Sequence, residues 1–107
     1  MAKGVPWSLH RLPIIDAGSG RINAVIDTPK GSRVKYKYDE QTGLFRVSKL
    51  LPLGAEFPYN FGFIPSTQGE NGDALDVLIL MEEVLCLGMV TPVRLIGVLA
   101  AQQVEKR

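Results

Sequence analysis

The feature that most constrains the fold is a turn followed directly by an apolar strand. Asn71-Gly72 is a dipeptide that reverses the chain readily, because both residue types tolerate positive φ. Leu75–Met81 is apolar on both parities, apart from Asp76, and predicts a strand covered on both faces. We therefore expect Asp76 to be at least partly buried. A buried carboxylate needs a cation, a metal or several hydrogen-bond donors.

The two carboxylates at this junction have two interpretations. Asp73 lies in the turn and can point to the same place as Asp76. Two convergent carboxylates suggest a hard cation such as Mg²⁺. The alternative is structural: Asp73 caps the turn and Asp76 pairs with a lysine or arginine. These residues taken alone favour the structural interpretation, because turns capped by an aspartate are common.

Length and composition predict one ordinary globular domain. The chain has 107 residues, of which 46% are hydrophobic and 21% are charged. A net charge of +1 gives no electrostatic case for binding nucleic acid or a membrane surface. Cys86 is the single cysteine, which suits a reducing compartment, and its apolar neighbours predict a core position. With no signal peptide and no apolar span of sufficient length, we expect a soluble cytoplasmic protein.

Short strands dominate the expected secondary structure. Residues 1–21 have no clear period and predict an irregular arm, held down by Trp7 and Leu9. His10 is the single histidine, which excludes a metal cluster built from several histidines. Five or more short strands with glycine and proline turns predict a small closed barrel. The expected strands are residues 21–28, 34–39, 44–50, 61–65, 75–81 and 92–101.

Two motifs resemble those of the soluble inorganic pyrophosphatases. They are Pro58-Tyr59-Asn60-Phe61-Gly62-Phe63-Ile64-Pro65 and Asn71-Gly72-Asp73-Ala74-Leu75-Asp76. The family patterns are Pro-x-Asn-Tyr-Gly-Phe-Ile-Pro and Asp-Gly-Asp-Pro-Leu-Asp, at the same spacing. Segments 26–36, 39–45 and 92–99 agree as well. The resemblance implies an OB-like five-stranded barrel over residues 22–107, following the arm and lacking the family's C-terminal helical part.

The resemblance also implies a chemistry based on Mg²⁺. In the family, several Mg²⁺ ions bridge carboxylates and the phosphates of pyrophosphate, and a water shared by the metals attacks in line. Asp73 and Asp76 match aspartates that bridge the activating metals, so the family's catalytic role would fall on Asp73. Asp27 stands where the family has a metal-site glutamate. Lys35 matches a phosphate-binding lysine, and Lys49 replaces a phosphate-binding arginine.

Five further positions depart from the family pattern. Asn71 replaces a metal-binding aspartate and brings no negative charge. Lys37 replaces a glutamate and reverses the sign of the charge. Phe57 and Phe61 replace tyrosines and lose their hydroxyl donors. Gln103 falls near the place of another metal-binding aspartate, and the family's next site residues would lie beyond the end of this sequence.

These departures predict absent or strongly impaired hydrolysis of pyrophosphate, with the chain acting as a binding or assembly module. We expect Asp73 and Asp76 to pair with Lys35, Lys37 or Lys49 in place of a metal. One alternative is a weak metal-dependent phosphohydrolase completed by a neighbouring subunit. A less favoured one is an OB-type nucleic-acid binder, against which the near-zero net charge argues. Apolar segments 84–87 and 93–99 predict a homo-oligomer.

Overall fold

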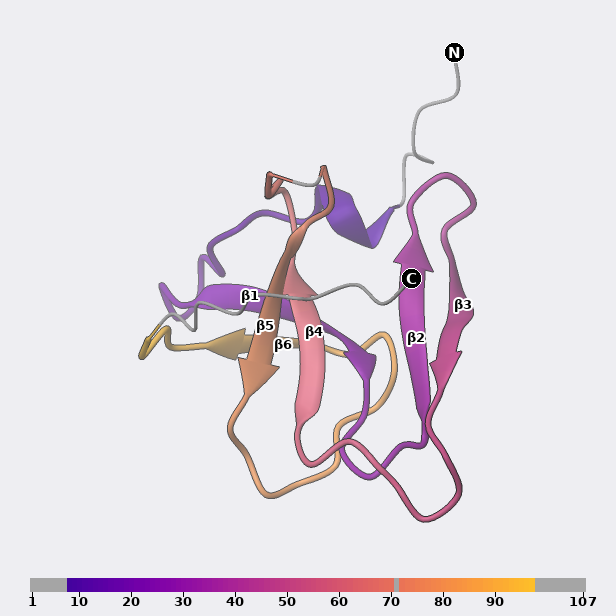
Figure 1. Ribbon diagram of the computed structural model, residues 1–107. Coiled ribbons are helices and arrows are strands. Elements are labelled where there is room, and N and C mark those ends of the chain that lie inside the picture. Colours follow the sequence, from indigo (N-terminus) through magenta and orange to yellow (C-terminus); the bar gives the residue numbers. More distant parts are fainter. Residues whose placement is uncertain (1–7, 71, 98–107) are drawn as a thin grey trace.

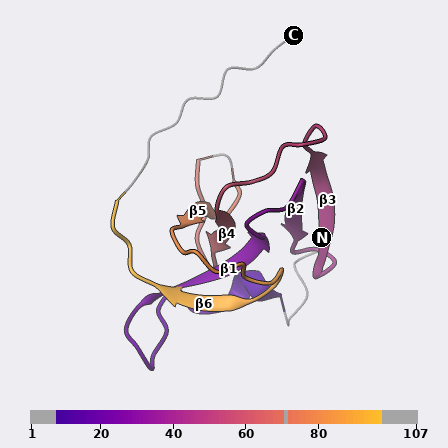
Figure 2. The same cartoon turned by 90° about the horizontal axis from the view of Figure 1, so that it is seen from below.

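The computed structural model describes residues 8–70 and 72–97 and shows a mainly β fold. Two antiparallel sheets make up the body (Figures 1 and 2). One sheet has four strands in the order β5-β4-β1-β6, and the other is the hairpin β2-β3. The elements are the 3₁₀ turn η1 (Leu9–Arg11) and the strands β1 (Ile22–Thr28), β2 (Val34–Asp39), β3 (Leu44–Leu50), β4 (Asn60–Ile64), β5 (Leu75–Ile79) and β6 (Val90–Val93).

Strand β1 lies at the centre of the larger sheet. It pairs with β4 on one side and with β6 on the other, with Val25 opposite both Phe63 and Val90. Its residues 23–26 are buried, because strands flank β1 on both edges and side chains cover both faces. The core cluster joins Ala24 and Ile26 to Ile79 of β5. Strand β1 therefore fixes the positions of the strands around it.

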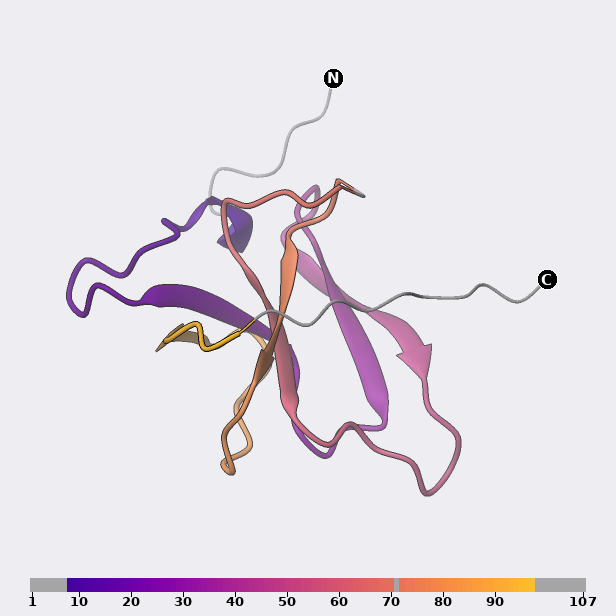
Figure 3. The same ribbon diagram turned by 60° about the vertical axis from the view of Figure 1, so that its left-hand side comes forward.

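The hairpin β2-β3 stands beside the larger sheet without joining it as a strand neighbour (Figure 3). Both of its strands have the predicted bounds, and Gly43 takes the expected positive φ of 75° in the turn. Thr28 Oγ1 accepts a hydrogen bond from Tyr36 N, so a side chain links β2 to β1 where a closed barrel would have a ladder. The prediction of a closed five-stranded barrel is therefore wrong in its closure, although the mainly β, OB-like class is confirmed.

Strand β5 corrects a second prediction. It is the edge strand of the larger sheet and pairs with β4 alone among the described strands. Leu75 and Asp76 are exposed, so this strand is not covered on both faces and Asp76 is not buried. Cys86 is also exposed rather than part of the core. It lies in the loop between β5 and β6.

The last strand is shorter than predicted and begins earlier. Strand β6 covers Val90–Val93, where its ladder with β1 ends at the pair Ile22 and Val93. Residues 94–97 follow without regular structure, and residues 98–101 of the expected strand lie outside the described chain. Across the described residues, the structure has no helix long and apolar enough to cross a membrane.

The N-terminal segment from residue 8 onward packs on the body. Leu9 N donates to the hydroxyl of Tyr38, and Ser66 Oγ donates to the carbonyl of Leu12. Ser8 caps η1 by accepting from His10 N. The arm is irregular apart from η1 and a single bridge between Ile15 and Ile22. Trp7, which we expected to hold the arm down, lies outside the described residues.

Candidate active site

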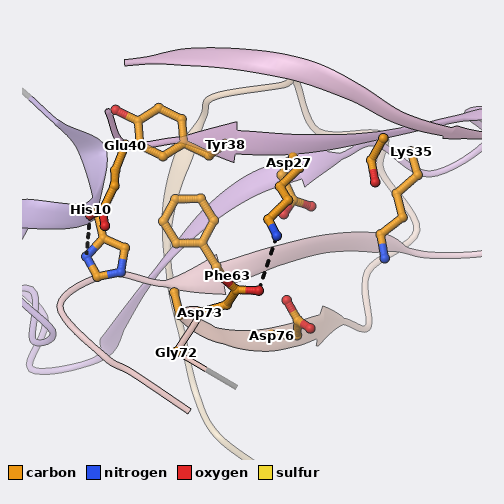
Figure 4. A pocket seen from close by; sticks show the side chains of 12 residues that line it. His10, Asp27, Lys35, Tyr38, Glu40, Phe63, Gly72, Asp73 and Asp76 are labelled. Atoms are coloured by element: carbon orange, nitrogen blue, oxygen red, sulfur yellow. Dashed lines mark hydrogen bonds and ion pairs between the residues drawn. The ribbon is translucent and has the colours of Figure 1, made fainter. Parts of the chain in front are cut away.

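An open depression of about 320 Å³ lies where the hairpin faces the larger sheet (Figure 4). Strands β1, β2, β3, β4 and β5 all contribute to it, together with η1 and the turn before β5. Side chains that are far apart in the sequence thus meet in one place. The lining residues are His10, Asp27, Lys35, Lys37, Tyr38, Glu40, Ser48, Phe63, Gly72, Asp73, Ala74 and Asp76.

Strand β2 supplies the two lysines of the depression. Lys35 and Lys37 are two residues apart, so the alternation of a strand places both on one face. The Nζ atom of Lys37 lies 3.1 Å from Oδ2 of Asp73, which confirms the expectation that an aspartate of the motif pairs with a lysine. Both side chains are more than half exposed, so the pair contributes little to stability. Its consequence is local: an ammonium group neutralises the carboxylate.

Asp27 and Asp76 face each other across the middle of the depression (Figure 4). Asp27 belongs to the buried strand β1 and is half-buried itself. Burial, with a smaller contribution from the charge of Asp76, raises the pKa of Asp27 to about 6. The hydroxyl of Thr28 and the ammonium of Lys35 oppose this rise only in part. Near neutral pH the protein therefore holds this carboxylate ionised at a cost.

The other end of the depression was not predicted as part of a site. His10 stacks on Phe63 with ring centroids 6.2 Å apart, and Phe63 stacks on Tyr38 at 5.7 Å. Glu40 Oε2 lies 3.7 Å from Nδ1 of His10. The sequence contained one usable signal, the single histidine of the chain. Its partners lie on three other segments, and only the tertiary fold brings them together.

The remaining predicted residues fall into two groups. Lys49 lies opposite Lys35 in the β2-β3 ladder but does not line the depression. Phe57 and Phe61 contact each other edge to face, with centroids 5.4 Å apart, and do not line it either. Asn71 and Gln103 lie outside the described residues. The structure thus brings together Asp27, Lys35, Lys37, Asp73 and Asp76 of the predicted set.

The donor set does not fit a dense metal cluster. Within residues 8–70 and 72–97, no group of three or more histidine, cysteine, aspartate or glutamate side chains is placed to hold a metal ion. A Mg²⁺ ion bound by one or two carboxylates would keep most of its water ligands. Asp73 and Asp76 are the exposed carboxylates of the depression that could hold it. Of these, Asp73 already forms an ion pair with Lys37.

Comparison with known proteins identifies the family. The family model described as inorganic pyrophosphatase matches residues 24–107. The chain belongs to the inorganic pyrophosphatase family. Among curated pyrophosphatases, the soluble enzyme of Oryza sativa subsp. indica is 42% identical over 94 residues, which cover 88% of this chain and 43% of the rice protein. The enzyme of Sulfolobus acidocaldarius is 40% identical over 84 residues, covering 78% of this chain and 49% of that protein.

Solved pyrophosphatase structures share the fold. The inorganic pyrophosphatase of Thermus thermophilus has a TM-score of 0.73 and 40% identity, covering 81% of this chain and 50% of that one. The enzyme of Neisseria gonorrhoeae has a TM-score of 0.69 and 36% identity, covering 78% of this chain and 48% of that one. This pyrophosphatase chain therefore spans about half the length of the relatives it matches.

Proposed function

We propose that this chain is a pyrophosphatase-type binding domain in which Mg²⁺-dependent hydrolysis of pyrophosphate is absent or strongly impaired. One observation carries the proposal: Lys37 Nζ lies 3.1 Å from Asp73 Oδ2. The family resemblance places a glutamate at position 37 and a metal beside Asp73. Here the ammonium group supplies the positive charge that a metal would otherwise supply.

Electrostatics gives the size of this effect. At an effective dielectric of about 20 and a separation of about 6 Å, one unit charge interacts with a divalent ion by about 5 kcal/mol. Replacing a glutamate by a lysine changes that charge by two units, which weakens metal binding by orders of magnitude even after screening by solvent. Asn71 removes a further negative charge from the motif. Together these changes oppose the loading of Mg²⁺ that the family chemistry requires.

A second candidate function follows from what the depression retains. Asp27, Lys35, Asp73 and Asp76 still line one depression. A carboxylate supplied by a neighbouring subunit would restore part of the metal site. The chain would then be a weak metal-dependent phosphohydrolase that acts only in an assembly.

The surface favours self-association. Exposed apolar side chains occur on β3 and on the loops after β3, β5 and β6. Leu53 and Ile96 are the most exposed of them, at 84% and 72%. A symmetric interface would cover these side chains. We therefore propose a homo-oligomer, with pyrophosphate or another phosphate compound as ligand and without nucleic acid or membrane partners, in the cytoplasm.

Phosphate release tests the proposal. The full chain and Asp73→Ala would be incubated with pyrophosphate and millimolar Mg²⁺ or Mn²⁺. We expect the wild-type rate to equal that of the variant within error, because Asp73 does not hold a working metal. A wild-type rate well above the Asp73→Ala background would refute impaired hydrolysis. A rate that rises more steeply than in proportion to protein concentration would favour completion by a neighbouring subunit.

A further inference from the structure

The depression extends beyond its carboxylates and lysines. It runs from Lys35 past Asp27 and Asp76 to His10 and Glu40 (Figure 4). A second hollow of about 360 Å³ shares His10 and Glu40 and continues along residues 66–68. Sites for small organic molecules measure about 300–1,000 Å³, so the two hollows provide room for more than a phosphate group.

Three stacked rings form the wall at this end. Phe63 is buried between the rings of Tyr38 and His10, inclined to them by 20° and 21°. The side chain of His10 is 26% exposed and lines both hollows, so part of its imidazole is accessible from them. Aromatic side chains of this kind, histidine included, stack on unpaired bases.

Backbone contacts hold His10 in place and leave its imidazole available. Ser66 N donates to the carbonyl of His10 at 2.8 Å, and Ser66 Oγ donates to the carbonyl of Leu12 at 2.6 Å. Within the described residues, Ser66 is the non-glycine residue with positive φ, at 57°. Backbone strain of this kind persists where the surrounding structure enforces it, and it clusters at ligand sites. The arm is thus fixed at the point where it presents its histidine.

Glu40 adds a hydrogen-bond acceptor beside the ring. Its carboxylate is 3.7 Å from the imidazole and its side chain is 48% exposed. A carboxylate accepts hydrogen bonds from the amino group of a base such as cytosine, as it does in base recognition. A ring with an amino group therefore fits this end better than a ring without one.

We propose that His10 and Glu40 form a base subsite, and that the depression binds a nucleoside diphosphate with an amino-bearing base. The diphosphate would lie toward Lys35 and Lys37, and the base would stack on His10. This inference rests on the proposed function in one respect: the lysine end of the depression takes a diphosphate. The base subsite goes further, because it identifies the ligand as a nucleoside diphosphate rather than free pyrophosphate.

Calorimetric titration of the full chain without added metal tests the subsite with three ligands. ADP carries an amino-bearing base, UDP carries a base without an exocyclic amino group, and pyrophosphate carries no base. We expect ADP to bind about tenfold more tightly than pyrophosphate, in line with the contribution of one stacked base. UDP should bind with an intermediate affinity, because its base stacks but has no amino group to donate to Glu40.

Variants assign the effect to the two side chains. His10→Ala should abolish the advantage of ADP over pyrophosphate and leave pyrophosphate binding unchanged. His10→Phe keeps a ring on Phe63 and should retain most of the advantage, which separates loss of stacking from detachment of the arm. Glu40→Ala should reduce the advantage of ADP over UDP and leave pyrophosphate binding unchanged. Glu56→Ala, on the loop after β3, is the matched control and should change nothing.

The outcomes separate this inference from the proposed function. Equal affinity of wild type for ADP and pyrophosphate, or an equal loss of both in His10→Ala, overturns the base subsite. If phosphate release by wild type exceeds that of Asp73→Ala while the ADP advantage depends on His10, impaired hydrolysis fails and the subsite stands. Failure of every ligand to bind overturns both the subsite and the binding role of the depression.

Discussion

At the scale of single residues, the fold opposes the ionisation of Asp27. Its pKa of about 6 lies above its ordinary value of 3.8, chiefly because the carboxyl is half-buried. The folded protein therefore holds this proton over a pH range in which the unfolded chain has lost it. The free energy of unfolding should fall as the pH rises from about 4 to about 6, and the loss should stay complete above that range.

Asp27→Asn tests this dependence, since an amide resembles the protonated carboxyl. We expect the variant to be more stable than wild type by about 1–3 kcal/mol at pH 8 and nearly equal to it at pH 3.5. Urea unfolding in the presence of a chelator at both pH values provides the measurement. A stability difference that does not change with pH would show that the carboxyl ionises in the folded protein as it does in water.

Asn60 is the residue whose loss should cost most stability among the buried polar side chains. It is fully buried, its carbonyl oxygen accepts from Lys30 N and Leu85 N, and its amide donates to the carbonyl of Glu83. Asn60→Ala would leave these groups without their partner and should destabilise the protein by about 2–4 kcal/mol. Thermal unfolding measures it, and a loss below about 1 kcal/mol would mean that water replaces the amide.

The sequence predicted part of the site residue by residue. The motif aspartate at position 73 was expected to pair with Lys35, Lys37 or Lys49, and the structure pairs it with Lys37. His10 and Glu40 could not be anticipated as a pair. They lie thirty residues apart with no shared motif, and only the docking of the arm on Tyr38 and Ser66 brings them together.

At the scale of elements, the close pairing of β4 with β1 requires a glycine at position 62. A Cβ atom at Gly62 would lie 2.9 Å from the carbonyl carbon of Val25, and still closer to its oxygen. Because these are backbone atoms of the central strand, the ladder itself would have to move. Gly62→Ala should therefore destabilise the protein by more than about 3 kcal/mol.

Gly97→Ala is the matched control for that substitution. A Cβ atom at Gly97 meets nothing within 4 Å, so this variant should unfold within about 0.5 kcal/mol of wild type. Chemical denaturation of both variants measures the difference. If Gly62→Ala proves as stable as the control, β1 and β4 are not packed as closely as the structure shows.

Strand bounds were predictable where alternation is local and not where burial depends on neighbours. The hairpin β2-β3 has its predicted bounds because its pattern and its turn glycine are both local signals. Strand β5 is a nearly continuous apolar run, which predicted cover on both faces. It lies instead at an edge of the sheet and exposes Leu75. An apolar run shows that a strand can be covered, whereas the order of strands decides whether it is.

At the scale of the whole molecule, the uncovered apolar surface predicts self-association. Light scattering at micromolar concentration should give a multiple of the 11.7 kDa chain mass. Leu95→Lys, at an exposed apolar position after β6, should lower that mass or abolish soluble expression, because a charge would enter the interface. Gln41→Lys, in the hairpin turn, is the control. A single species near 11.7 kDa for wild type would contradict the oligomer.

The central claim is that Lys37 occupies the place of a metal ion beside Asp73. Mg²⁺ binding by calorimetry, compared between wild type, Lys37→Met and Lys37→Glu, tests it most directly. Removing the charge should strengthen Mg²⁺ binding, and restoring the family's glutamate should strengthen it further, by about tenfold or more at each step. Equal Mg²⁺ affinity in the three proteins would contradict the claim.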